Sequence, residues 1–157
     1  MATIGRTLGK VSELTIVDKV RAGQALTLRN LLHDLDQGNL FGTMATIHFA
    51  RFVVLAPDGV DAGAYLLFTC IYVGSLVHFL AALYGYAPLA AQLNTIWTFC
   101  ERGAGDGSLA AFAEFVQRCG VTADLFYAAY PDLTVADVQH GVRVHSAVQN
   151  LLDAVQS

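Results

Sequence analysis

Charged residues are scarce in this 157-residue chain. Asp, Glu, Lys and Arg together make up only 14% of it, against roughly 25% in ordinary globular domains. The nine Lys and Arg residues are scattered singly, so no basic patch predicts a nucleic-acid partner. Because 55% of the residues are hydrophobic, the composition excludes a disordered chain. It favours one domain that hides extra surface, either by forming an oligomer or by enclosing an apolar ligand.

Signals of export, disulfide bonding and metal binding are also missing. The first ten residues contain no apolar run, so we expect no secretory signal peptide. The three cysteines, Cys70, Cys100 and Cys119, are odd in number and widely spaced. Such usage argues against a disulfide framework and against a C-x-x-C metal site. It is typical of a reducing compartment, and we expect a cytoplasmic protein.

Common catalytic motifs are absent as well. The chain contains no G-x-G-x-x-G that opens a βαβ unit, no Walker loop, no G-x-S-x-G and no H-E-x-x-H. Glutamate occurs only at positions 13, 101 and 114, so a catalytic carboxylate pair is not indicated. Any function must therefore be argued from single polar residues in an apolar setting.

The longest uncharged stretch covers residues 62–100 and contains no Asp, Glu, Lys or Arg. Residues 64–83 are long enough to span a bilayer. However, Gly74-Ser75 interrupts the run, His78 would lie inside the span, and no Lys or Arg cluster flanks it. We therefore favour a buried strand followed by a buried helix that Pro88 splits, and we regard a membrane partner as the less favoured alternative.

Hydrophobic periodicity predicts the remaining elements. Alternation over residues 12–21 indicates a first strand, and leucines at 28, 31, 32 and 35 indicate an amphipathic helix over residues 23–36. Further signals are the turn sequence Pro57-Asp58-Gly59 and the helix caps Ser75, Ser108 and Thr134. Together with the periodicity, they predict strands over residues 44–56, 64–73 and 124–130. They also predict helices over residues 76–86, 89–98, 109–119 and 135–155. We expect an N-terminal tail over residues 1–11 and one domain over residues 12–157.

The predicted order of elements is β-α-β-β-α-(α)-β-α. This is the split βαβ pattern of a ferredoxin-like α+β fold, an antiparallel sheet with helices on one face and, here, extra C-terminal helices. The other face of the sheet needs a cover, and in this architecture the usual cover is the sheet of a second protomer. We therefore expect a dimeric α+β barrel, as a homodimer or a larger assembly of the chain.

His48 and Arg51 stand out because they lie inside the apolar run of residues 46–56. In a regular strand these two residues point to opposite faces, so they share one cavity only if a bulge changes the register. One interpretation makes His48 a satisfied core histidine and pairs Arg51 with Glu13 or Asp18. The other interpretation makes both residues catalytic candidates that anchor an anion or oxygen in a buried pocket.

His145 is the candidate cofactor ligand. It lies on one stripe of the last predicted helix, with Val138, Val142, Val148, Leu152 and Val155. A histidine in such a position can ligate a haem iron, although a satisfied core or interface histidine fits the same pattern. His78 and Tyr72 lie in the uncharged stretch, and we expect them to shape the wall of a ligand pocket, while His33 falls opposite the leucine stripe of its helix.

Three segments carry a resemblance to a known group. TIHFARFVVLAPDG, YLLFTCIYVGSLVHFLAAL and FYAAYPDLTVADV resemble a bacterial group whose members carry HFARFVVLD, a later N-Y/F-D-G and a YPG-x-T-V phrase. That group is distantly similar to the dye-decolourising peroxidases and other dimeric α+β-barrel proteins. The resemblance implies a ferredoxin-like fold in a superfamily of haem peroxidases and cofactor-free oxygenases. Residues 71–74 read IYVG where the group has N-Y/F-D-G, so its acidic residue is absent here.

Two functions follow as expectations. The first is a small-molecule-binding domain with an apolar cavity that uses His48, Arg51 and His145, with haem binding and peroxidase- or oxygenase-like oxidation as its most specific form. The second is a non-catalytic dimeric or assembly-forming module in which residues 62–100 form the interface.

Overall fold

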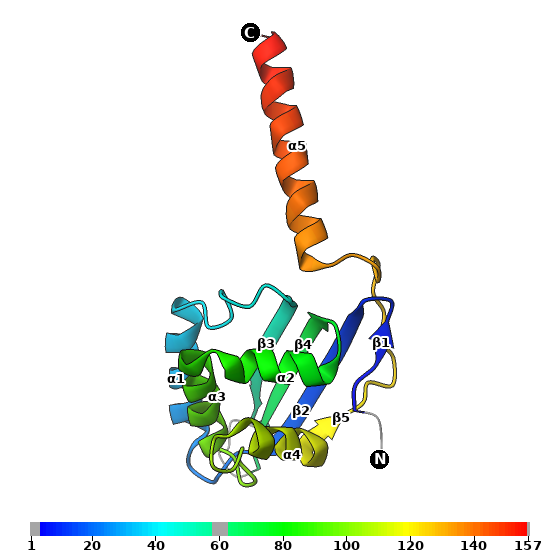
Figure 1. The fold of residues 1–157 in the computed structure, drawn as a ribbon. Helices are drawn as coiled ribbons and strands as arrows, with labels where there is room; N and C mark the ends of the chain where they lie inside the picture. Colours follow the sequence, from blue (N-terminus) through cyan, green and yellow to red (C-terminus); the bar gives the residue numbers. More distant parts are fainter. Residues whose placement is uncertain (1–3, 58–62, 157) are drawn as a thin grey trace.

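A five-stranded antiparallel sheet forms the centre of the computed structural model, which describes residues 4–57 and 63–156 (Figure 1). Three nine-residue strands make up most of it: β2 (Val11–Lys19), β4 (Tyr65–Val73) and β3 (Ile47–Leu55), with β4 in the middle. Two short strands, β1 (Thr7–Leu8) and β5 (Gly120–Val121), pair with the free side of β2 at different heights. The fold is therefore α+β, as predicted.

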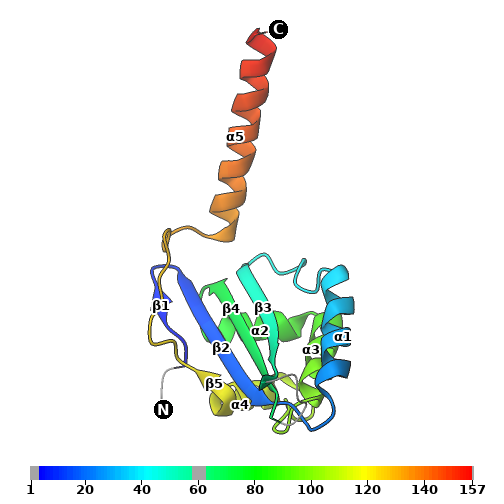
Figure 2. The same cartoon turned by 180° about the vertical axis from the view of Figure 1, so that it is seen from behind.

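Four helices cover one face of this sheet, and a fifth projects away from it. They are α1 (Ala25–Gln37), α2 (Leu76–Gly85), α3 (Ala87–Thr98) and α4 (Leu109–Cys119). Seen from behind, the sheet lies in front and no helix crosses it (Figure 2). The fifth helix, α5 (Val135–Gln156), projects beyond the end of the sheet and has no buried residue.

Alternation along the strands explains which face the helices cover. In β4, the even-numbered residues are all buried and the odd-numbered ones are not, because successive side chains point to opposite sides of a sheet. The buried side meets the apolar faces of the helices around Trp97, which is fully buried. The core contains Leu14, Ile16, Leu66, Phe68, Cys70, Phe79, Leu83, Leu93, Ile96, Phe112 and Phe115.

The predicted helix boundaries are confirmed by local chemistry. The Ser75 hydroxyl accepts a hydrogen bond from the His78 N–H, and the Ser108 hydroxyl accepts one from the Ala111 N–H. Each bond satisfies an N–H that has no partner inside its helix. Pro88 lies in the first turn of α3, where proline is tolerated. The uncharged stretch therefore forms two helices that meet at 102°, and no single helix in the described ranges is long and apolar enough to cross a membrane.

The segments near the two ends of the chain differ from the prediction. Residues 124–130 do not form a strand, because β1 already occupies the edge of β2 at Val11 and Ser12. Only Gly120 and Val121 pair with β2, and the chain then runs beside β1, where the Lys10 N–H donates to the Pro131 carbonyl. The expected N-terminal tail contains β1. The predicted turn at residues 57–59 lies mostly outside the described residues.

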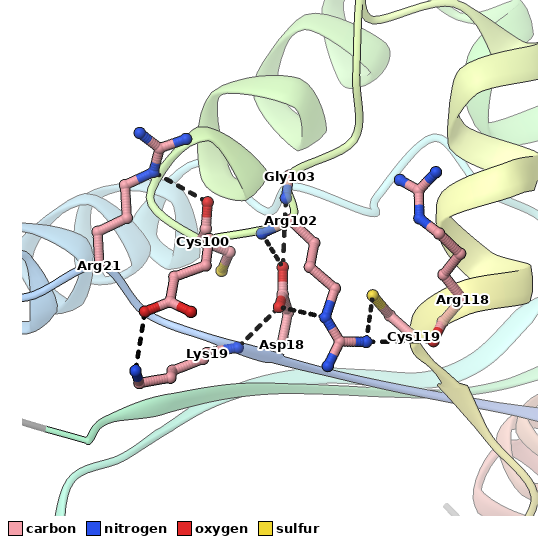
Figure 3. A network of polar contacts seen from close by, with 9 residues as sticks. Asp18, Lys19, Arg21, Cys100, Arg102, Gly103, Arg118 and Cys119 are labelled. Carbon is pink, nitrogen blue, oxygen red and sulfur yellow. Dashed lines mark hydrogen bonds and ion pairs between the residues drawn. The ribbon is translucent and has the colours of Figure 1, made fainter.

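A buried carboxylate joins the helical layer to the sheet. Asp18 in β2 is 1% exposed, and its oxygens accept hydrogen bonds from the backbone N–H groups of Lys19, Arg102 and Gly103 at 2.8–3.3 Å (Figure 3). The Arg102 guanidinium also lies 3.6 Å from it. Because a buried charge is tolerated only when it is paired and hydrogen-bonded, these contacts hold the turn after α3 against β2.

We expect Asp18→Asn to lower the free energy of unfolding by about 2–4 kcal/mol, because an amide nitrogen would face N–H donors and the charge partner of Arg102 would be lost. Urea unfolding measures the change. The matched control is Glu101→Gln, which removes an exposed ion pair with Lys19 and should cost less than about 1 kcal/mol. Equal losses in the two variants would contradict the role given to Asp18.

Candidate functional site

The strongest candidate site is a cavity of about 550 Å³ beside the edge strand β3, which we call the β3 cleft. The C-terminal half of α1 forms one wall and β3 forms the other, and residues 39–41 join them. Asn39 has a φ of +51°, a left-handed conformation that asparagine tolerates better than most residues. The lining is Leu32, His33, Leu35, Asp36, Asn39, Leu40, Phe41, Ile47, His48, Phe49, Ala50, Arg51 and Phe52.

A β-bulge brings His48 and Arg51 to the same cleft. Ile47 lies opposite Tyr72, whereas Phe49 lies opposite Ile71, so β3 has one residue more than β4 at this point. His48 is that extra residue. The bulge allows Ile47 to pack against the core while Phe49, two residues later, is 76% exposed on the opposite face. The register change that the sequence left open is therefore present.

The side chain of His48 has an unusual environment. Its Nε2 atom is buried and makes no hydrogen bond with any residue of the described ranges. A buried polar atom without a partner costs roughly 1–3 kcal/mol, so proteins rarely keep one without a reason. His48 borders the β3 cleft and a second cavity on the opposite side of β3. A bound molecule in either cavity could satisfy the Nε2 atom.

Arg51 is exposed and only lightly held. Its Nε atom donates to the hydroxyl of Thr69 on β4 at 2.9 Å, and within the described residues its terminal nitrogens have no recorded partner. The ion pair with Asp18 that the sequence suggested does not form, because Asp18 points to the helical side. Glu13 points to the same side as Arg51 and borders a neighbouring cavity with it. The Arg51 guanidinium therefore remains available to a ligand.

The other predicted site residues are not near this cleft. Tyr72 is buried on the helical side of the sheet and stacks on Phe79, with 4.0 Å between the ring centroids. His78 is exposed on α2, where its Nδ1 atom lies 2.8 Å from the hydroxyl of Ser75. Neither residue lines any of the five cavities described in this structure. The structure thus brings together only His48 and Arg51.

His145 is exposed on α5 and also lines none of the five cavities. The residues nearest to it along its own stripe, Val142 and Val148, are at least half exposed. An axial histidine holds a haem inside a pocket, and no such pocket surrounds His145 in one chain. The described residues do not fit a haem ligated by His145 within a protomer, and we derive no chemistry through haem.

Buried thiols and phenols offer no reactive nucleophile. Burial raises the pKa of Cys70 and of Cys100 to about 12, and it raises the pKa of Tyr72 to about 12 as well. These groups stay protonated at neutral pH, whereas the thiolate is the reactive form of cysteine. Among the described residues, no group of three His, Cys, Asp or Glu side chains could hold a metal ion.

Sequence reasoning missed part of the site. His33 was expected to face away from the leucines, and it is exposed, yet it lines the cleft together with Asp36. These two residues are three positions apart and so share a side of α1. The signal was available in the helical spacing, but the sequence does not reveal that the chain folds back across that side before entering β3.

Comparisons with known proteins add no relative: the chain matches no protein-family model, no curated protein and no solved structure.

The raised thiol and phenol pKa values predict a loss of stability at high pH. In the folded state Cys70 titrates near 12, whereas its ordinary value is 9.0, so the folded protein binds more protons between these values. The contribution is complete below pH 9 and is lost as the pH rises toward 12. We expect the urea midpoint to fall over this range and to fall less in Cys70→Ala, compared at each pH with the same variant at pH 7. A midpoint with equal pH dependence in both proteins would contradict the assignment.

Proposed function

We propose that the protein is a small-molecule-binding domain that holds a compact apolar acid in the β3 cleft. The observation that carries this proposal is that one cavity is bordered by His48, whose buried Nε2 atom has no partner among the described residues, and by Arg51, whose terminal guanidinium nitrogens have no recorded partner there either. Both side chains can donate hydrogen bonds to a carboxylate when Nε2 carries its proton. Few other groups would satisfy both donors at once.

The composition of the cleft supports a ligand with two different ends. Apolar side chains from α1 and from the 39–41 segment, such as Leu32, Leu35 and Phe41, form the part away from Arg51. Ligand pockets of this kind combine apolar walls with a few placed polar groups, in volumes of roughly 300–1,000 Å³. The cleft of about 550 Å³ falls within that range. Asp36 and His33 lie on the α1 wall and favour a ligand whose charge is confined to one end.

A finer statement of the fold belongs to the same proposal. The sheet order β5–β2–β4–β3, with α1 linking β2 to β3 across β4, supports a ferredoxin-like split βαβ unit. In such a unit the uncovered face is available for contact with a second protomer. We propose that the protein works as a homodimer.

One observation favours the second function, a non-catalytic assembly module. Five of the nine β4 side chains, all from the uncharged stretch, point away from the helices, and Leu67 and Ile71 are among them. The other four belong to the core, so only the outward residues of this strand could serve as an interface. This function does not require the β3 cleft to bind anything.

Octanoate tests the binding proposal because it has one carboxylate and an apolar chain. We expect isothermal titration calorimetry to show saturable binding that weakens at least tenfold in His48→Leu and in Arg51→Ala, since a hydrogen bond to a charged group contributes about 1.5–3 kcal/mol. The His48→Leu protein without ligand should be as stable as the wild type or more stable, because the unpartnered nitrogen is gone.

Two controls accompany this experiment. Octanol has the same chain length without the carboxylate and should bind at least tenfold more weakly than octanoate. His78→Gln removes an exposed imidazole remote from the cleft and should leave octanoate binding unchanged. Binding that survives both site substitutions, or no saturable binding of octanoate, would contradict the proposed function.

A further inference from the structure

Two apolar surfaces in this chain have no cover. The first is the uncovered face, formed by the side chains of β4 and β3 that point away from the helices. On β2 the outward residues Val11 and Glu13 are only 3% and 4% exposed, and residues 123–130 border the same cavities as these two side chains. Phe49, Leu55 and Tyr65 on the uncovered face are 76%, 47% and 42% exposed. The second is the apolar stripe of α5, whose members Val148, Leu152 and Val155 are 50%, 48% and 78% exposed. Exposed apolar surface of this extent commonly marks an interaction site.

The two surfaces are continuous at one point but diverge. Val138, in the first turn of α5, lines a cavity with Val11, Phe49 and Ile71 at the end of the uncovered face. From there α5 points away from the sheet, beyond the ends of the strands where β2 begins (Figures 1 and 2). The rest of the stripe therefore cannot reach the uncovered face of its own chain.

We propose that the uncovered face binds α5 of a second copy of this chain, and that the two copies exchange their α5 helices. Consider a two-fold dimer in which Val11 and Val73 of both copies lie near the two-fold axis. Each α5 leaves its own sheet at this end, and it reaches the uncovered face of the partner from the same end. Such an exchange is self-complementary, as closed dimers require. It covers both apolar surfaces, whereas pairing α5 with α5 would leave the sheet uncovered.

The lengths of the two surfaces agree. The stripe extends from Val138 to Val155, about 26 Å at 1.5 Å per residue. The outward face of β4 extends from Val73 to Tyr65, about 27 Å at roughly 3.4 Å per residue. A helix contact of this length and about 10 Å in width has a footprint of about 260 Å². Two such contacts bury about 1,000 Å² on both sides together, which is close to the minimum of roughly 1,000 Å² expected of a specific interface.

The polar positions of the two surfaces also agree. On the sheet, Thr15, Thr69 and Arg51 form a polar band between apolar ends, and Thr69 lies about 14 Å from Val73. On α5, His145 is the polar member of the stripe, about 10 Å from Val138. When Val138 packs near Val73 of the other copy, His145 falls on this band, where hydroxyl groups can hydrogen-bond an imidazole. His145 thus acts as an interface residue that sets the register of the helix.

Site-directed cross-linking tests this arrangement in the full chain. Thr69→Cys and His145→Cys, made in separate proteins and mixed, should give a cross-linked dimer with a short bis-maleimide reagent. The native cysteines are buried and provide a low background. The matched control is Ala147→Cys, two residues further on and therefore on the opposite side of α5, mixed with the same Thr69→Cys protein, and it should cross-link at least fivefold less.

Light scattering provides an independent measurement. We expect the wild type to have twice the mass of the chain, and Leu152→Glu to be a folded monomer with an unchanged circular dichroism spectrum, because residue 152 is half exposed in one chain. Asn150→Glu, on the polar side of α5, should remain a dimer. A monomeric wild type would overturn the proposal. A dimer that survives Leu152→Glu and gives no preferred cross-link at position 145 would also overturn it, in favour of a sheet-to-sheet dimer.

Discussion

The structure depends on a sheet that receives all of its helical cover on one side. Packing α1 to α4 against the same face gives the chain one core, centred on Trp97 and the inward residues of β2 and β4. It also leaves three unsatisfied features: an apolar outer face, a free edge along β3 and a helix without a neighbour. Each candidate function described above uses one of these features.

Two carboxylates on β2 hold the irregular segments to this sheet, one on each side. Asp18 faces the helices and binds the turn after α3. Glu13 faces the other way, is 4% exposed, and accepts hydrogen bonds from the N–H groups of Arg6 and Ala123 and from the Thr15 hydroxyl. Because Glu13 holds the chain just after β5, it also determines where the segment leading to α5 leaves the sheet. Glu13 thus holds the start of the segment that leads to α5, although Ala123 lies 110 residues later in the sequence.

Local sequence patterns predicted most of the elements and only part of the site. Helix caps at Ser75, Ser108 and Thr134 and the break at Pro88 act over a few residues, so they can be read without a structure, and the structure confirms them. The strand expected over 124–130 was wrong because a distant segment, β1, had taken its pairing partner. That competition leaves no mark in the local pattern.

The site required long-range information of the same kind. The sequence singled out His48 and Arg51 but could not decide whether they share a cavity, since the answer depends on a one-residue bulge against β4. It grouped His145 with them on helical spacing, although a stripe on a helix does not say what the stripe packs against.

The bulge has a consequence for how this strand could have arisen. Ile47 and Phe49 already point to opposite sides, as neighbours in a regular strand do. Deleting His48 would therefore join them into an uninterrupted ladder with every other side chain kept in place. His48 is the one residue of β3 that the pairing with β4 does not require. The β3–β4 pairing does not need His48, and His48 adds a buried polar atom to the protein. Contacts of its side chain therefore explain its presence better than a role in holding the strand. In this strand, the presence of one extra residue, rather than a change of composition, places a buried polar atom at the edge of the sheet.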